Sequence, residues 1–300
     1  MTGTVLLLNI LLSAISDCAY TLAVGLTLAA YFTSQSDKLV KLRKWLLSTA
    51  AIMLIAQSLR PWFLAASMSG SSRFDENLTL IPSILSSTHQ GELWKLNIIA
   101  IVALFVAIGW MRRRTHNTIY LAASICLCII AFIKAASGHA ADNGDFTRLE
   151  TLQWLHILAT AVWAGTIIVT GLISLPTLTR SDPDNHAIWQ HLQRISTTAT
   201  YAIIVVLASG IYTADRELAA PLSTLWSSLW TSTWGKILIA KVIVVLFALA
   251  LGAMNRFICL TKDMSSQRIT LSSRLLSIEA GAMLVVLSLS GWLGNTSPTM

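Results

Sequence analysis

A histidine lies inside the hydrophobic segment LQWLHILATAVWAG, residues 152–165. Imidazole nitrogens are common metal ligands. At 100° per residue, Gln153, His156, Thr160 and Trp163 share one helix face about 80° wide. A polar stripe on an otherwise apolar helix is expected to face the interior of a helix bundle. We therefore take His156 as a candidate metal ligand, while a histidine satisfied by one hydrogen bond remains the alternative.

Two further histidines could join the same site. His139, in GHAADNG, is separated from the His156 segment by one short loop and is expected at a similar depth. His89 belongs to another connection on the same side of the membrane, where a solvated loop histidine is the alternative. Imidazoles gathered near one membrane face are typical of a metal site. The predicted ligands are therefore His139, His156 and His89.

Ionisable side chains inside a bilayer cost about 2.5–3.5 kcal/mol each at its centre, which makes them candidates for function. Asp17 and Glu279 fall near the middle of the first and last apolar segments, and Lys241 lies deep in another. Such groups either line a transport pathway or pair with one another between helices. A pairing of Lys241 with one of the two carboxylates is one possibility.

Membrane helices are needed to position these residues. The 300-residue chain is 55% hydrophobic and 12% charged, whereas a soluble domain is about 25% charged. Apolar runs of roughly 18 residues or more recur along it, which is typical of transmembrane helices. Helices satisfy their backbone hydrogen bonds within each segment, as hydrocarbon requires. We predict an all-α polytopic membrane helix bundle with eight transmembrane helices, at residues 5–31, 42–66, 93–111, 119–136, 151–175, 196–214, 234–257 and 269–294.

The distribution of cations predicts the orientation of this bundle. The odd-numbered connections hold Lys38, Lys41, Arg43, Lys44, Arg112, Arg113, Arg114, Arg180, Arg194, Arg256, Lys262, Arg268 and Arg274, and the even-numbered ones hold Arg73, Arg148 and Arg216. By the positive-inside rule, the odd connections are cytoplasmic and both termini are periplasmic. The net charge of +7 is therefore attributed to topology and to anionic lipid, and no nucleic-acid partner is inferred from it.

No linker or low-complexity segment divides the chain. We expect one integral bundle with an N-terminal four-helix half at residues 1–138 and a C-terminal four-helix half at residues 139–300. The long outer connection at residues 67–92 is either a short helix on the membrane face or an irregular cap. The phosphate-binding motif G-x-x-x-x-G-K-[ST] is absent from the sequence, so no nucleotide is expected. A soluble-type enzyme is the least expected class, because no nucleophile–base pair or catalytic motif is visible.

Four sequence motifs, in chain order, resemble one known family. WLHILATAVWAG resembles the Leu-His-x-x-Ala-x-x-x-Trp-x-Gly helix of the bacterial copper-resistance protein D (CopD) family. RISTTATYAIIVVLASGIY is similar to the Arg-Phe-Ser start and Thr-Gly end of the family's next helix. TSTWGKILIAKVIVVLFALALGAMNRF and RLLSIEAGAMLVVLSLSGWLGNTSPT resemble its last two helices. Trp234, Ile195 and Ser209 replace the usual Tyr, Phe and Thr, and the resemblance covers roughly residues 139–298.

The resemblance implies a multi-pass protein of the bacterial inner membrane that handles copper, often beside a periplasmic CopC-like copper carrier. The positions that match the family pattern are His156, Trp163, Lys241, Asn255 and Glu279. Copper, as Cu(I) or Cu(II), would meet the histidines at the outer face and pass into or across the membrane. Asp17 and Glu279 are the carboxylates that could serve as weaker sites along the bundle.

Two other functions remain open from the sequence. A b-type cytochrome would bind haem between axial histidines on facing helices, which requires His139 to be drawn into the fourth predicted helix. A scaffold that delivers copper to a partner without transporting it has the same sequence features as a transporter.

Overall fold

A computed structural model of the chain describes residues 3–32, 36–110, 117–138, 144, 146–178, 185–218, 229–259 and 265–296. Its helices are α1 (Gly3–Phe32), α2 (Ser36–Ser69), α3 (Phe74–Ser87), α4 (His89–Trp110), α5 (Asn117–Ala136), α6 (Arg148–Val169), η2 (Thr170–Ser174), α7 (Leu175–Leu178), α8 (Asn185–Leu218), α10 (Thr233–Met254), η3 (Asn255–Cys259) and α11 (Ser266–Leu293). The segments η2 and η3 are single π-helical turns. The described part of the chain contains no strand, as predicted for an all-α bundle.

Eight of the described helices are long and apolar enough to cross a membrane. They coincide in order and approximate position with the eight predicted spans. The main difference is in α8, which begins at Asn185 where the prediction began at residue 196. Its first turns are polar, so hydropathy alone does not mark them as helical. The connection at residues 67–92 contains α3, so it forms a short helix and not an irregular cap.

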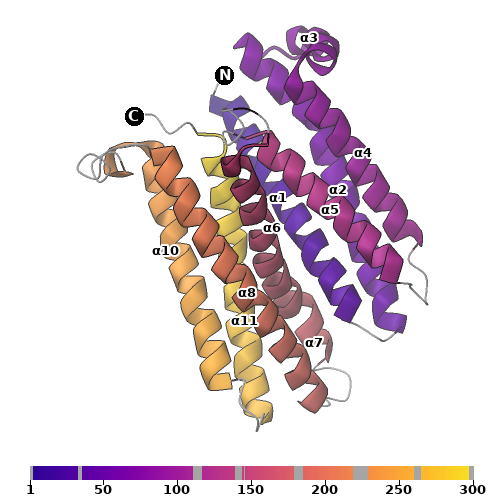
Figure 1. Cartoon of the computed structure of the whole chain (residues 1–300), viewed down its shortest axis with the longest axis vertical. Coiled ribbons are helices and arrows are strands. Elements are labelled where there is room, and N and C mark those ends of the chain that lie inside the picture. The colour runs from indigo at the N-terminus through magenta and orange to yellow at the C-terminus, as the bar shows by residue number, and fades with distance from the viewer. Residues whose placement is uncertain are drawn as a thin grey trace.

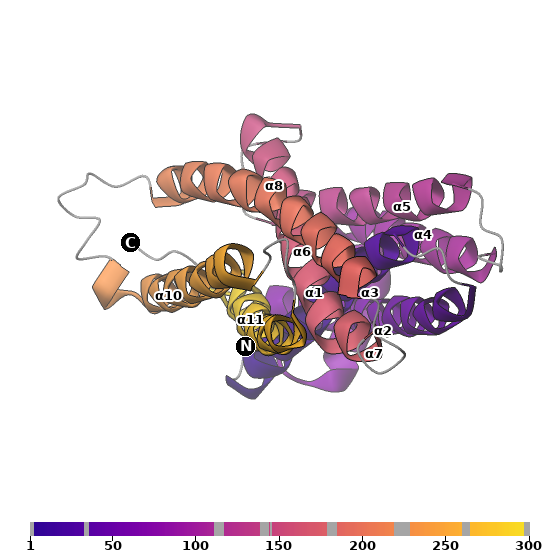
Figure 2. The same ribbon diagram turned by 90° about the horizontal axis from the view of Figure 1, so that it is seen from below.

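The helices form one elongated bundle in two halves (Figure 1). Helix α1 begins and α11 ends at the end of the bundle that carries α3, which we call the α3 end. Figure 2 shows α2, α4 and α5 on one side of the central pair α1 and α6, with α10 and α11 on the other side. Helix α8 packs along α6. One cluster of buried apolar side chains lies in each half. Helix α1 packs against α2, α6 and α11, and therefore joins the two halves.

The central helices touch backbone to backbone. A Cβ atom added to Gly25 of α1 would overlap the carbonyl oxygen of Gly165 in α6, and one added to Gly165 would overlap the carbonyl oxygen of Thr21. Small residues allow membrane helices to approach this closely, which strengthens van der Waals packing. Gly165 therefore allows the backbone of α6 to come close to that of α1.

A proline inside α2 is accommodated by a side chain from α4. Pro61 lacks an N–H group, so it cannot donate the helical hydrogen bond to the carbonyl of Gln57. The indole Nε1 of Trp94 donates to that carbonyl oxygen instead, at 2.7 Å. Because an unsatisfied carbonyl is costly in hydrocarbon, this bond ties α4 to α2 at the proline.

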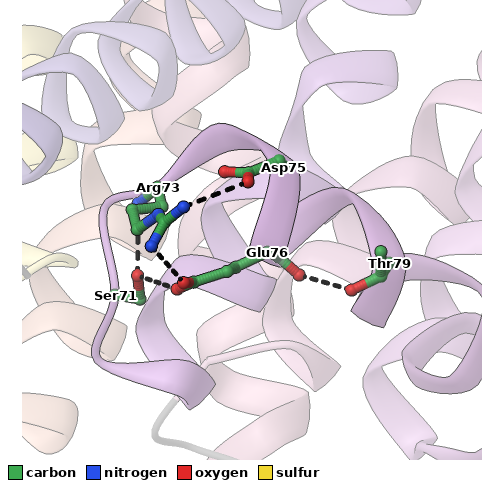
Figure 3. A network of polar contacts seen from close by, with 5 residues as sticks. All are labelled: Ser71, Arg73, Asp75, Glu76 and Thr79. Carbon is green, nitrogen blue, oxygen red and sulfur yellow. Dashed lines mark hydrogen bonds and ion pairs between the residues drawn. The ribbon is translucent and has the colours of Figure 1, made fainter.

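The start of α3 is held by an exposed polar network (Figure 3). Arg73 forms ion pairs with Asp75 at 3.4 Å and with Glu76 at 3.1 Å. Ser71 donates to the other oxygen of Glu76, and Thr79 donates to the Glu76 backbone carbonyl, both at 2.7 Å. Acidic residues in the first helical turn also complement the helix dipole. These contacts fix where the helix begins, but exposed pairs contribute little to stability.

Candidate metal site

The helix that carries His156 has a defined starting point. Thr147 is the N-cap of α6, and its hydroxyl accepts a hydrogen bond from the backbone N–H of Glu150 at 3.2 Å. The buried Glu150 carboxylate accepts in turn from the backbone N–H of Phe146 at 2.5 Å. Reciprocal capping of this kind satisfies backbone donors at a helix start. His156 follows nine residues after the cap, about 13 Å along the helix.

The imidazole of His156 faces α8. Its Nδ1 lies 3.0 Å from the hydroxyl oxygen of Ser209, and that hydroxyl donates to the carbonyl oxygen of Val205 at 2.5 Å. A serine has one hydroxyl proton. Because that proton already serves a backbone carbonyl, we assign Nδ1–H of the neutral ring as the donor toward Ser209. The neutral ring then carries its free lone pair on Nε2, which is the arrangement found in metal-binding histidines.

Two neighbours define the space around this ring. A Cβ atom added to Gly210 would lie 3.1 Å from Cε1 of His156, so the absence of a side chain at Gly210 makes room for the imidazole. From α10, the ammonium of Lys241 lies close enough to interact electrostatically with His156. Helices α6, α8 and α10 therefore all contribute to the surroundings of the ring.

Deeper in the same half, several buried polar atoms have no hydrogen-bond partner within the described part of the chain. They are the hydroxyl of Thr160, the indole Nε1 of Trp163 and Oε2 of Glu279. Trp163 and Glu279 face each other between α6 and α11, where the indole acts as a weak hydrogen-bond donor toward the carboxyl group although the contact lacks ordinary hydrogen-bond geometry, and each residue is only 2% exposed. A Cβ atom added to Gly252 of α10 would lie 3.2 Å from Oε1 of Glu279, so a glycine at this position makes room for the carboxyl group. Along α6, Thr160 and Trp163 lie about 6 Å and 10 Å beyond His156, away from the α3 end.

Asn255 lies at the opposite end of this half. Its side-chain oxygen accepts a 2.6 Å hydrogen bond from Ser272, which joins η3 to α11 in a buried pair. The next residue, Arg256, donates to the hydroxyls of Ser196 at 3.0 Å and Thr200 at 2.8 Å on α8. These contacts give Asn255 a structural partner, so it is satisfied without a ligand.

Asp17 has a partner that the sequence did not single out. It forms an ion pair with Lys134 of α5 and not, as one possibility had it, with Lys241. The guanidinium of Arg60 on α2 also acts on Asp17 electrostatically. Asp17 therefore belongs to a charged cluster in the N-terminal half, apart from the polar atoms around His156.

The three predicted histidine ligands are not seen together. His139 lies outside the described residues. His89 is the first residue of α4, and the adjacent Gln90 donates to the carbonyl of Ser137, in the turn that follows α5, at 3.4 Å. Within the described ranges, no three His, Cys, Asp or Glu side chains form a group that could hold a metal ion.

The sequence did not identify Ser209 as the partner of His156. The Ser-Gly pair at positions 209 and 210 could have indicated this contact. The serine hydroxyl offers a hydrogen-bond partner, and the glycine leaves room for an imidazole from a neighbouring helix. The sequence likewise does not single out Lys134 as the partner of Asp17, because lysines lie on several helices.

Comparison with known proteins identifies two matching family models. The model described as Copper resistance protein D matches residues 189–293, and the model described as Copper resistance protein D-like, N-terminal domain, matches residues 2–149. The second match covers the first half of the chain, where the sequence motifs showed no ordered resemblance. The His156 helix lies between the two matched segments.

Curated relatives carry related names. The chain is 22% identical over 275 residues to Copper resistance protein D of Pseudomonas syringae pv. tomato, covering 89% of this chain and 87% of the relative. It is 26% identical over 230 residues to Copper transport protein CutJ of Bacillus subtilis, covering 75% of this chain and 41% of the relative. It is also 26% identical over 219 residues to Inner membrane protein YebZ of Escherichia coli, covering 71% and 67%. No solved structure matches the chain.

Proposed function

The chain belongs to the copper resistance protein D family, and on that premise we propose that it accepts copper at the α3 end through His156 and passes the ion along α6. It is a multi-pass protein of the inner membrane, with eight helices that can span it. Copper is the cargo in this proposal. The chain acts as a carrier and not as an enzyme.

The observation that carries the proposal is the orientation of His156. The hydrogen bond from Nδ1 to Ser209 fixes the tautomer and the ring plane, and leaves Nε2 as the ligand atom. A fixed second-shell contact of this kind raises the basicity of a metal-binding imidazole. Neutral imidazole suits Cu(I) as well as Cu(II). His139 and His89 remain the expected additional ligands at the same end.

The polar atoms below His156 support onward movement. Thr160, Trp163 and Glu279 place buried polar groups along one side of α6, and the carboxyl group of Glu279 is the ionisable group among them. An isolated buried carboxylate is unfavourable in a membrane unless it meets a cation or a proton. We propose that copper pauses at Glu279, because transport requires sites weak enough for the ion to leave.

The surroundings of the protein follow from its charges. The cation distribution along the sequence places the α3 end in the periplasm. Copper would then arrive from that side, for instance on a CopC-like carrier. The lipid bilayer is the other partner, and the chain needs neither nucleotide nor nucleic acid in this scheme.

Metal content and an absorption spectrum of the purified protein test the binding site. We expect copper on the wild type, its loss in His156→Ala, and its retention in the control His186→Ala. His186 is exposed at the start of α8, at the other end of the bundle. Equal copper in all three proteins would reject the His156 site, and a Soret band would favour the haem alternative. Copper binding without uptake into liposomes would favour a delivery scaffold.

A further inference from the structure

A second charged centre lies in the N-terminal half, and the proposed copper route does not use it. Lys134 of α5 forms a direct ion pair with Asp17 of α1. Arg60 of α2 also interacts electrostatically with Asp17. Asp17 is 8% exposed. Two cations thus face one carboxylate, which leaves one positive charge in excess among the described side chains of this cluster.

The guanidinium of Arg60 makes few hydrogen bonds within the described part of the chain. Its Nη2 makes a long contact of 3.4 Å with the hydroxyl of Ser13. Its Nε is buried and has no hydrogen-bond partner in the part of the chain that the structure describes. Together, Nε–H and Nη2–H form the edge of a guanidinium that binds a carboxylate through two parallel hydrogen bonds. In Arg60 this edge is therefore held by one weak contact.

Ser13 adds a further donor beside this edge. Its oxygen accepts from Nδ2 of Asn295 at 3.0 Å and from Arg60, so its own hydroxyl proton is available for an acceptor. Asn295 is held in place by Asn9 at 2.7 Å and by the carbonyl of Gly291 at 2.7 Å. The cluster is therefore rich in fixed donors and poor in acceptors.

From this arrangement we infer that Arg60, Lys134 and Ser13 form a binding site for a small monovalent anion, a halide or a short carboxylate. The excess of one charge selects a monoanion, because a dianion such as phosphate would leave the buried cluster negative. An anion would complete the hydrogen bonding of Arg60, whose unsatisfied Nε is otherwise costly in a membrane. The side chain of Lys134 is 41% exposed, so the ion enters past this lysine.

Thermal unfolding of the full-length protein in detergent tests the site. Sodium chloride and sodium acetate are titrated against sodium gluconate at constant ionic strength, because gluconate is too bulky for the site. A ligand that binds only the folded state raises the melting temperature in a saturable way. We expect this rise with chloride, with acetate, or with both, and the pattern identifies a halide or a carboxylate site.

Variants separate a specific site from a general salt effect. Arg60→Lys keeps the charge but loses the two-bond edge, and should raise the half-saturating anion concentration about tenfold. Arg73→Lys, at an exposed arginine near α3, should behave as the wild type. Lys134→Gln makes the cluster neutral and should abolish the anion effect, which keeps the test valid if Arg60→Lys does not fold.

Two results would overturn the inference. One is a wild-type melting temperature that is the same in all three salts. The other is an anion response in Lys134→Gln and Arg60→Lys equal to that of the wild type. Copper binding at His156 should be unchanged in these variants, because the two clusters lie in different halves, so each proposal can fail without the other.

Discussion

The hydrogen bond between His156 and Ser209 leads to a quantitative prediction for Ser209→Ala. The substitution removes the hydroxyl that meets Nδ1 and leaves the backbone of Val206 as the remaining hydrogen-bond partner of the ring, and loss of one such bond costs about 0.5–1.5 kcal/mol. Because 1.4 kcal/mol corresponds to a factor of ten in affinity, and loss of a second-shell partner typically weakens metal binding by 10–100-fold, we expect copper affinity to fall about 10- to 100-fold. The substitution should leave the backbone hydrogen bonds of α8 intact, because the Ser209 hydroxyl is only an additional donor to the Val205 carbonyl.

The assay is a competitive Cu(I) titration of purified protein against a colorimetric chelator. Ser209→Thr is the matched control, because it keeps the hydroxyl and introduces the residue usual in the family pattern. The threonine variant should bind copper nearly as tightly as the wild type. An alanine variant that binds within twofold of the wild type, with unchanged thermal stability, would refute the assignment of Nδ1 as the oriented donor.

Three further predictions concern transport and stability. Glu279→Gln keeps the shape of the side chain but removes its charge, so copper uptake into liposomes should fall about tenfold or more while binding at His156 persists; loss of both together would contradict separate sites. Gly25→Ala forces a Cβ against the Gly165 backbone and should lower unfolding free energy by about 1–3 kcal/mol, measured by denaturation in mixed micelles. Trp94→Phe removes the indole bond to the α2 carbonyl and should cost about 1 kcal/mol, whereas the control Trp62→Phe should cost less, since the Trp62 indole nitrogen has no partner in the described chain.

Hydropathy and residue size were sufficient to predict much of the bundle. The eight spans follow from apolar length, and the close approach at Gly165 follows from the small residues around it. The inward-facing stripe of His156, Thr160 and Trp163 follows from the period of 3.6 residues. These features are encoded within single helices, so a single sequence is enough to predict them.

The specific pairings depend on how the helices rotate and slide against one another. Asp17 could have met a lysine on several helices, and packing of α5 against α1 selects Lys134. Several hydroxyls occur along α8, and its contact with α6 selects Ser209. The first turns of α8 escaped prediction because they are helical without being apolar. Partner choice between helices is therefore the part of the site that required the structure.

Copper uptake into proteoliposomes is the direct test of copper transport through His156. Purified wild type, His156→Ala and the control His186→Ala are reconstituted at equal density, and internal copper is measured over time. We expect uptake by the wild type and by His186→Ala, and uptake by His156→Ala no greater than in protein-free liposomes. Uptake by His156→Ala at the wild-type rate would contradict this expectation.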